Sequence, residues 1–117
     1  MPPLHDVLAA IARRPDAAGA IVVSDEGLMI DAALPPGLED EAVAALAATA
    51  LKSLATFTTA LGHGSLREMV IESEHGDVVI LPVRAHTHLV VIARRDAELG
   101  DLLHDLHTHG PALAELV

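Results

Sequence analysis

The segment from Glu39 to Leu61 is as long as a helix of several turns, yet it carries almost no charge. Between Ala42 and Leu61 the only charged residue is Lys52. Apolar side chains recur along it at helical spacing, at Val43, Leu46, Ala47, Ala50, Leu54, Phe57 and Leu61. The other side has a mild polar strip formed by Thr49, Lys52, Ser53, Thr56 and Thr59. A helix without a strongly polar face usually has neighbours on more than one side. We therefore expect this helix to contact both its own sheet and a second protein.

The length and charge of the chain narrow the classes of function. A length of 117 residues predicts a single domain over residues 1–117, long enough for a real core. The net charge of −10, with only seven Lys and Arg residues, argues against nucleic acid and anionic membrane surfaces as partners. The absence of cysteine excludes disulfides and zinc–thiolate sites and suits a cytoplasmic protein.

The N-terminal residues, the length of the apolar stretches and the aromatic content narrow the expected function further. Met1-Pro2-Pro3 leads directly into an amphipathic helix, without the basic start and apolar core of a signal peptide. We see no stretch close to the roughly 20 apolar residues that span a bilayer, so we expect no membrane insertion. One Phe and no Tyr or Trp count against small-molecule pockets and single-stranded nucleic-acid sites, which rely on aromatic rings.

The order of the expected elements is helix, two strands, helix, three strands, helix. The first helix covers Leu4–Ile11, and Pro15-Asp16 stops it. The expected strands are Ala20–Ser24, Leu28–Ala32, Leu66–Ser73, Asp77–Val83 and Leu89–Ala93, with Pro82 implying an edge or a bulge. Gly62-His63-Gly64 ends the middle helix, and the last helix runs from near Asp96 to Gly110-Pro111. Gly100 inside that helix suggests a close packing contact.

Short connections make each group of strands antiparallel. Several strands are apolar on successive residues, so both faces of the sheet must be covered. These features predict an α/β fold, a three-layer α/β/α sandwich around a five-stranded antiparallel sheet. The long helix would lie on one face and the two terminal helices on the other.

Four segments in this order carry a family resemblance: Gly19–Asp31, the Ala-rich middle helix, Leu89–Ala93 and Asp96–Gly100. Together they resemble the roadblock family (roadblock / dynein light chain seven), specifically its bacterial single-domain members. The resemblance implies a homodimer in which the third strands of the two subunits pair antiparallel and the two middle helices lie side by side. It also implies a role as regulator or platform for a Ras-like small GTPase, without catalytic machinery of its own.

These expectations assign residues to two surfaces. The expected dimer interface consists of Val43, Leu46, Ala50, Leu54, Phe57, Met69 and Ile71. The expected partner-binding strip consists of Thr49, Lys52, Ser53 and Thr56. Phe57 is either a partner anchor or a core residue, and the sequence alone favours the core.

Eight histidines raise the question of a metal site. His86 and His88 are two apart, and His104 and His107 are three apart, with His109 close behind. No cysteine or Glu-x-x-His pattern accompanies them, so we expect no metal. Histidines near a helix end are also favoured by the helix dipole.

The sequence offers no complete catalytic or nucleotide-binding motif. Ser24 beside Asp25 fits ordinary hairpin chemistry, and Ser65 near His63 has no nucleophile elbow around it. No Gly-x-x-x-x-Gly-Lys-Ser/Thr motif is present, so we expect neither cofactor nor enzymatic activity. Two alternatives stay open: a small-molecule sensor with a pocket between helix and sheet, and a self-assembling structural protein whose sheet continues past the dimer.

Overall fold

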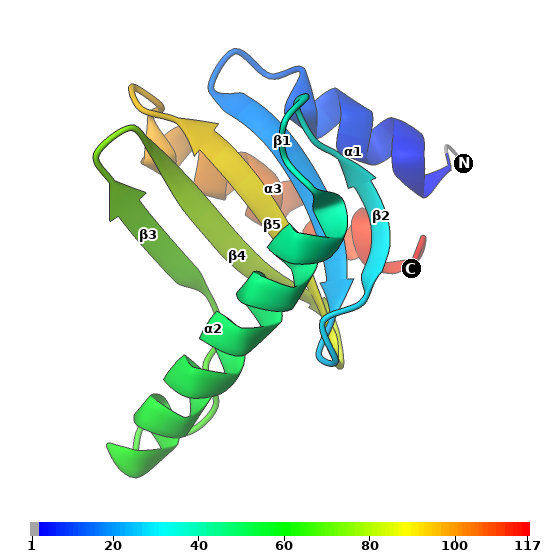
Figure 1. The fold of residues 1–117 in the computed structure, drawn as a ribbon. Helices are drawn as coiled ribbons and strands as arrows, with labels where there is room; N and C mark the ends of the chain where they lie inside the picture. Colours follow the sequence, from blue (N-terminus) through cyan, green and yellow to red (C-terminus); the bar gives the residue numbers. More distant parts are fainter. Residues whose placement is uncertain (1–2) are drawn as a thin grey trace.

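The computed structural model describes residues 3–117, so the expected absence of a signal peptide at Met1-Pro2 lies outside the described residues. The helices are α1 (Leu4–Ala12), α2 (Asp40–Ala60) and α3 (Leu99–Ala114). The strands are β1 (Ala17–Ser24), β2 (Met29–Ala33), β3 (Met69–Ser73), β4 (Gly76–Arg84) and β5 (Thr87–Arg94). They form one five-stranded sheet in the order β2-β1-β5-β4-β3, with every neighbouring pair antiparallel (Figure 1). The predicted order of elements is confirmed.

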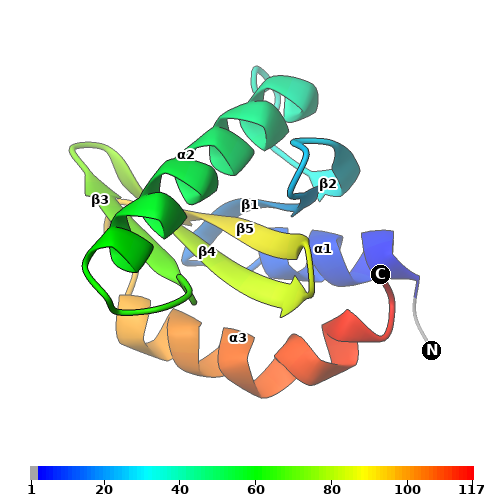
Figure 2. The same ribbon diagram turned by 90° about the horizontal axis from the view of Figure 1, so that it is seen from below.

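Helices cover both faces of this sheet, as predicted. α2 crosses one face diagonally, while α1 and α3 lie on the other (Figure 2). Alternate residues of β1 divide between the two layers, because successive strand side chains point to opposite faces. Val22 belongs to the core under α1 and α3, and Ile21 and Val23 belong to the core under α2. This explains why β1 is apolar on successive residues.

β3 is shorter than the sequence predicts, because its pairing begins only at Met69 instead of Leu66. Met69 lies opposite Ile80 in β4, and continuing that antiparallel register would bring residue 67 opposite Pro82. Proline has no N–H to donate to a neighbouring strand, so the ladder ends before this position. Pro82 also marks a register shift against β5, between Pro82 and Arg84, so the predicted irregularity is confirmed.

α3 is longer than predicted. Gly110-Pro111 does not end it, because the helix continues through Pro111 to Ala114. An interior proline removes one backbone hydrogen bond and costs about 3 kcal/mol. The continuation buries Leu113 to 4% exposure in the core under α1 and α3, and this burial offsets part of the cost.

Two predictions about glycines have different outcomes. Gly62 and Gly64 both have positive φ, at 74° and 81°, and they follow the end of α2 as expected. The close contact expected at Gly100 is wrong, because a Cβ placed there would meet no atom within 4 Å. Gly100 is exposed in the first turn of α3, where nothing packs against it.

Candidate functional site

α2 packs on the sheet with its small residues instead of its largest ones. The side chains buried against the sheet are Ala44, Ala47, Ala48 and Leu51. Short side chains let the helix lie close to the strands, and the β1–β2 turn also lies against it. A Cβ on Gly27 in that turn would be 3.3 Å from the Cα of Ala45. The alanine stripe is therefore the contact between α2 and its own domain.

Except for Leu51, the large apolar residues of α2 and its C-terminal cap Leu61 lie on a neighbouring, more exposed flank of the helix. The exposed fractions are 70% for Leu46, 39% for Leu54, 57% for Phe57 and 51% for Leu61. Val43 and Ala50 are half-buried on the same flank. At 100° per residue this flank is adjacent to the sheet-facing one. The C-terminal half of α2 lies on the β3 side of the sheet (Figure 1). We call the residues on this flank the apolar stripe. The sequence-based preference for Phe57 in the core is wrong.

β3 exposes apolar side chains at the edge of the sheet, with Ile71 on the face that α2 covers and Val70 on the opposite face. Val70 is 41% exposed and Ile71 is 37% exposed. Met69, which the sequence assigns to the dimer interface, is only 7% exposed and belongs to the core under α2. The sequence missed Val70, although strand alternation places it on the face opposite Met69.

The two edges of the sheet differ in regularity. β3 pairs with β4 without any register shift from Met69 to Ser73, and no other strand within residues 3–117 pairs with its outer edge. β2 contains a register shift opposite Val22 and Val23, which leaves Ile30 unpaired and 45% exposed. Bulges of this kind blunt an edge against further pairing. The β3 edge is therefore the better template for another strand.

The polar strip is exposed along α2. Thr49, Lys52, Ser53 and Thr56 are all exposed. The hydroxyl groups of Thr49 and Thr56 donate to the carbonyl oxygens of Ala45 and Lys52, each at 3.0 Å. Among the described residues, the ammonium of Lys52 has no carboxylate within 4.0 Å, so its charge is available at the surface. Its role in partner binding stays a prediction.

Several histidines contact carboxylates from distant parts of the chain. His5 lies 3.2 Å from Asp31, and His107 lies 2.7 Å from Glu68. These pairs connect α1 to β2 and α3 to the segment before β3. They are contacts between one imidazole and one carboxylate. Within residues 3–117, no group of three or more His, Asp or Glu side chains is arranged to hold a metal ion.

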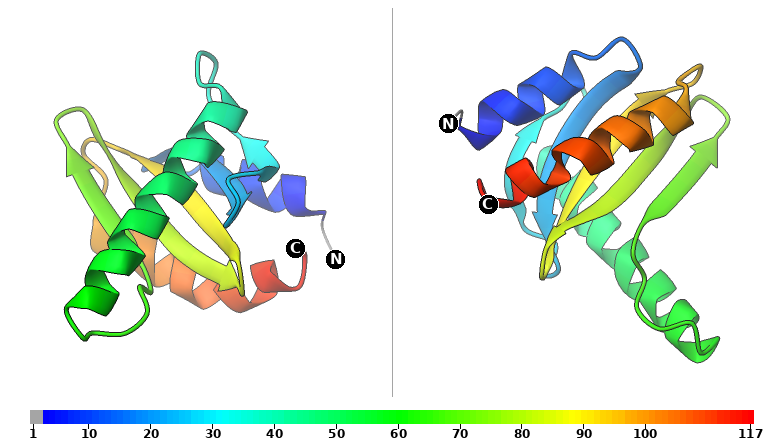
Figure 3. Two further views of the ribbon diagram at one scale, coloured as in Figure 1. Left: turned by 60° about the horizontal axis from the view of Figure 1, so that its bottom comes forward. Right: turned by 180° about the vertical axis from the view of Figure 1, so that it is seen from behind.

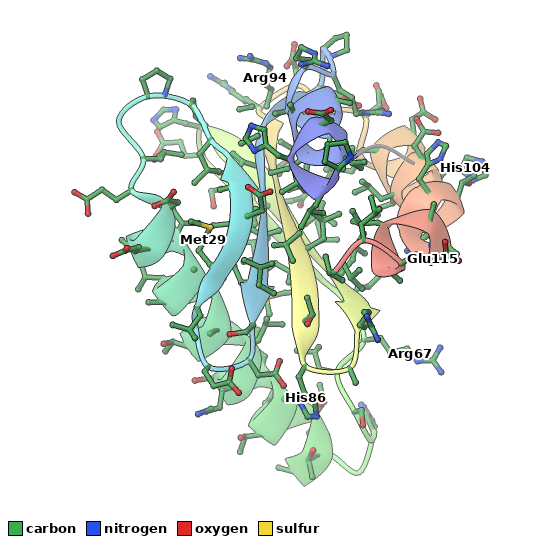
Figure 4. All side chains as sticks on the ribbon, turned by 90° about the vertical axis from the view of Figure 1, so that its right-hand side faces the viewer. Met29, Arg67, His86, Arg94, His104 and Glu115 are labelled. Atoms are coloured by element: carbon green, nitrogen blue, oxygen red, sulfur yellow. The ribbon has the colours of Figure 1, made fainter. Side chains whose placement is uncertain are left out.

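His86 and His88 do approach one side, as their spacing suggests, and they meet Asp25. The Nδ1 atom of His86 is 2.7 Å from Oδ2 of Asp25, and Nδ1 of His88 is 3.6 Å from Oδ1. Figure 4 shows His86 where the β1–β2 and β4–β5 turns meet beside α2. Burial lowers the pKa of His88, and the charge of Asp25 counteracts part of this shift.

Ser24 acts as the sequence predicts for an ordinary turn residue. Its hydroxyl oxygen accepts a hydrogen bond from the backbone N–H of Leu28 at 3.1 Å. This contact closes the β1–β2 turn, and the neighbouring Asp25 is directed to the histidines instead of to the serine. The pair is not arranged as a nucleophile and its base.

An apolar groove lies on the other face of the sheet, between α1 and α3. These two helices diverge from one another in the view from behind (Figure 3). The groove has a volume of about 390 Å³, and its walls include Val7, Ile11, Leu106 and Leu113. It corresponds in position to the pocket between helix and sheet that a ligand sensor would need.

α2 also meets a simple test for membrane spans. Among the described residues, its length and composition suffice to cross a bilayer. The expectation that no segment approaches this length is therefore corrected for α2. Its window has 17% of its residues buried inside the domain, and a single helix of this kind is weak evidence for a span.

Comparisons with known proteins identify one matching family and several proteins of similar fold. The sequence profile of the Roadblock/LC7 domain matches residues 4–93. "Uncharacterized protein MJ0310" of Methanocaldococcus jannaschii is 32% identical over 82 residues, 70% of this chain and 71% of that protein. The solved structure of Myxococcus xanthus MglB has a TM-score of 0.88 at 17% identity, covering 97% of this chain and 93% of MglB. A Roadblock/LC7 domain from Streptomyces avermitilis has a TM-score of 0.85 at 20% identity, covering 96% and 95%. At these identities the structural matches establish the fold.

Proposed function

The chain belongs to the Roadblock/LC7 domain family, and from this premise we propose that it is a homodimeric, non-enzymatic regulator or scaffold that binds a Ras-like small GTPase. We further propose that residues 1–117 act as one domain and that the protein works in the cytoplasm. The apolar stripe of α2 beside the free β3 edge is the observation that carries the proposal.

The dimer is supported by apolar area that the protomer leaves uncovered. Leu46 and Phe57 expose more than half of their surface on one flank of α2. Val70 and Ile71 are exposed on the neighbouring edge strand. Burying such a surface is favourable by roughly 25 cal/mol per Å² of apolar area. A second copy provides a surface of the same shape and chemistry, as a two-fold interface requires.

The arrangement of the dimer follows from these two elements. Two β3 strands pair antiparallel across the two-fold axis, and their backbone groups satisfy each other along a regular edge. The two α2 helices then lie side by side through the apolar stripe. This arrangement leaves the polar strip of each α2 facing away from the interface.

The partner surface is supported by the character of this strip. It is weakly charged, with Lys52 as its only ionised residue, and pairing of two α2 helices doubles it. Such a surface suits a folded protein better than a phosphate or a metabolite. The net charge of −10 steers the dimer toward partners with basic surface.

The test uses the purified protein and a Ras-like small GTPase from the same organism. Calorimetry is carried out with the GTPase in its GDP and GTP states. Binding is expected in at least one state, and Thr56→Trp, a bulky change on the exposed polar strip, should weaken it while the mass in light scattering remains that of a dimer. Absence of heat and of a complex in both states, with a folded dimer, would reject the GTPase proposal.

A ligand sensor is the second candidate, because the groove between α1 and α3 is apolar and has a volume within the usual range of ligand sites. A thermal-shift screen with small apolar molecules separates the two functions. A stabilising ligand that fails to protect an Ile11→Trp variant would place that ligand in the groove. A self-assembling sheet is less well supported, since the bulge in β2 blunts the outer edge.

A further inference from the structure

A small pocket opens beside the polar strip, between α2 and the turns at the end of the sheet. Its volume is about 320 Å³. Leu51, Ala55 and Leu66 contribute apolar walls, while Asp25, His88 and Thr59 contribute polar groups. We call it the Asp25 pocket. It lies on the same side of the sheet as α2, near the position of His86 in Figure 4.

Two polar atoms in this pocket lack a hydrogen-bond partner within the described residues. Asp25 uses Oδ2 for His86 at 2.7 Å, and its backbone N–H donates to the carbonyl oxygen of His86 at 3.0 Å. These contacts fix the carboxylate and leave Oδ1 free. The buried Nδ1 of His88 is 3.6 Å from Oδ1, too far for a hydrogen bond, and has no partner. Of these two atoms only Nδ1 of His88 is buried, and buried polar atoms without partners are uncommon in folded proteins.

The negative charge in the pocket lining comes from Asp25. Lys52 lines the same pocket, but its ammonium is not within 4.0 Å of the Asp25 carboxylate. Burial keeps His88 neutral by lowering its pKa, so His88 adds no positive charge near neutral pH. The result is a carboxylate, 43% exposed and held by His86, in the lining of a cavity that also has aliphatic walls.

This combination matches one kind of side chain. An arginine has an aliphatic stem for the walls made by Leu51 and Leu66. Its planar guanidinium has several N–H donors, which suit a carboxylate together with neighbouring acceptors. The Oδ1 atom of Asp25 and the hydroxyl oxygen of Thr59 are such acceptors.

We propose that the Asp25 pocket is an arginine-binding pocket, which in the GTPase complex receives an arginine of the partner; this use rests on the proposed function. The pocket stays open in the proposed dimer. Its α2 residues Lys52, Ala55 and Thr59 lie on the flank away from Leu46 and Phe57. Because Lys52 belongs to both the pocket and the polar strip, a protein docked on the strip reaches the pocket directly.

The first test titrates the isotope-labelled protein with propylguanidinium, a probe made of a guanidinium and a short stem. Saturable amide shifts are expected at Asp25, Thr59 and His88, with a dissociation constant on the order of 1 mM for so small a ligand. The neutral isostere propylurea should bind at least about tenfold more weakly, since hydrogen bonds to charged groups are the stronger ones. An equal response to both probes, or no saturable response, would overturn the proposal.

Three variants test the charge and the shape of the pocket separately. Asp25→Asn should weaken propylguanidinium binding about tenfold or more, because it removes the charge and keeps the shape. Lys52→Gln should strengthen binding, because it removes a like charge from the rim. Ala55→Leu should block binding by filling the pocket without changing any charge. It keeps the test decisive if Asp25→Asn disturbs the structure of the turn. If all three bind as wild type does, the pocket is not the site.

The GTPase assay separates the pocket from the proposed function. If wild-type protein binds propylguanidinium but no GTPase, the arginine pocket stands and the GTPase proposal fails. If the GTPase binds wild-type and Ala55→Leu protein equally, the partner's arginine does not enter the pocket, and that part of the proposal is overturned. A loss of GTPase affinity of about tenfold in Ala55→Leu, with the dimer intact, supports both.

Discussion

Arg14 donates a hydrogen bond from Nη1 to Oδ2 of Asp105 at 2.6 Å, across 91 positions of the sequence. The same guanidinium donates from Nε and Nη2 to the two carboxylate oxygens of Asp16, at 2.9 Å and 3.0 Å. Arg14 therefore connects the segment after α1 to the middle of α3. Its hydrogen bonds lower the pKa of both Asp16 and Asp105.

Replacing Arg14 should cost stability in a pH-dependent way. A carboxyl whose pKa is lowered by folding stabilises the native state above its ordinary pKa of 3.8, and this contribution is lost as the pH falls through the lowered value. Loss of the Arg14–Asp16 pair should cost Arg14→Gln up to about 1 kcal/mol at pH 7, the upper end for partly exposed ion pairs. The difference from wild type should shrink below about pH 4. Urea unfolding at several pH values measures both, with the exposed Arg13→Gln as control. A difference that stays constant with pH would contradict this explanation.

The fold was largely predictable because its signals are local. The apolar strands, the turns at Gly27 and Gly62, and the irregularity at Pro82 each follow from the chemistry of neighbouring residues. The end of α3 was not predictable in the same way. Local rules favour a stop at Pro111, whereas burial of Leu113 depends on the position of the sheet.

The candidate site was predictable in part. Periodicity identified the large apolar residues of α2 but not which flank packs on the domain's own sheet. Ala44 and Ala47 occupy that position because small side chains permit close approach, and Phe57 is left exposed. The contact between Asp25 and His86 joins residues 61 positions apart and has no local signal.

Gly100→Ala should stabilise the protein by up to about 1 kcal/mol. Alanine favours helix more than glycine does, and the added methyl group meets no atom within 4 Å. Gly19→Ala provides the matched contrast. A Cβ there would be 2.9 Å from Cδ of Pro35 and 3.2 Å from the carbonyl oxygen of Ala33, so this change should destabilise. Melting temperatures of both variants test the pair, and a lower value for Gly100→Ala would reveal a contact that the domain alone does not contain.

A charge in the apolar stripe should disrupt the proposed dimer. Leu54→Glu or Ala50→Glu places a carboxylate in a surface that becomes desolvated on pairing, which costs several kcal/mol. Monomers or insoluble protein are expected at micromolar concentration, by light scattering coupled to gel filtration. Leu28→Glu is the control, since Leu28 is 66% exposed at the β1–β2 turn, away from the stripe. A wild-type mass equal to one chain would reject the dimer.

Chelation should leave the melting temperature unchanged. The three closest histidine contacts each engage a single carboxylate: His5 with Asp31, His86 with Asp25, and His107 with Glu68. The core clusters are aliphatic on both faces of the sheet. Thermal unfolding with and without EDTA is the measurement. A large decrease with EDTA would instead assign a metal to His86 and His88 or to His104 and His107.

His88 should make stability depend on pH in the weakly acidic range. Burial lowers its pKa from the ordinary value of 6.5, so between the lowered value and 6.5 the unfolded chain binds a proton that the native chain excludes. The free energy of unfolding therefore rises with pH in this window. The stability that neutral His88 contributes is lost as the pH falls from 6.5 toward the lowered pKa.

His88→Gln removes the titrating group, so it should flatten this part of the profile. His75→Gln should not, because His75 is 81% exposed at the β3–β4 turn. Urea unfolding from about pH 5 to pH 7 compares the three proteins. Equal slopes for wild type and His88→Gln would mean that the native protein binds the proton at His88 as readily as the unfolded chain does.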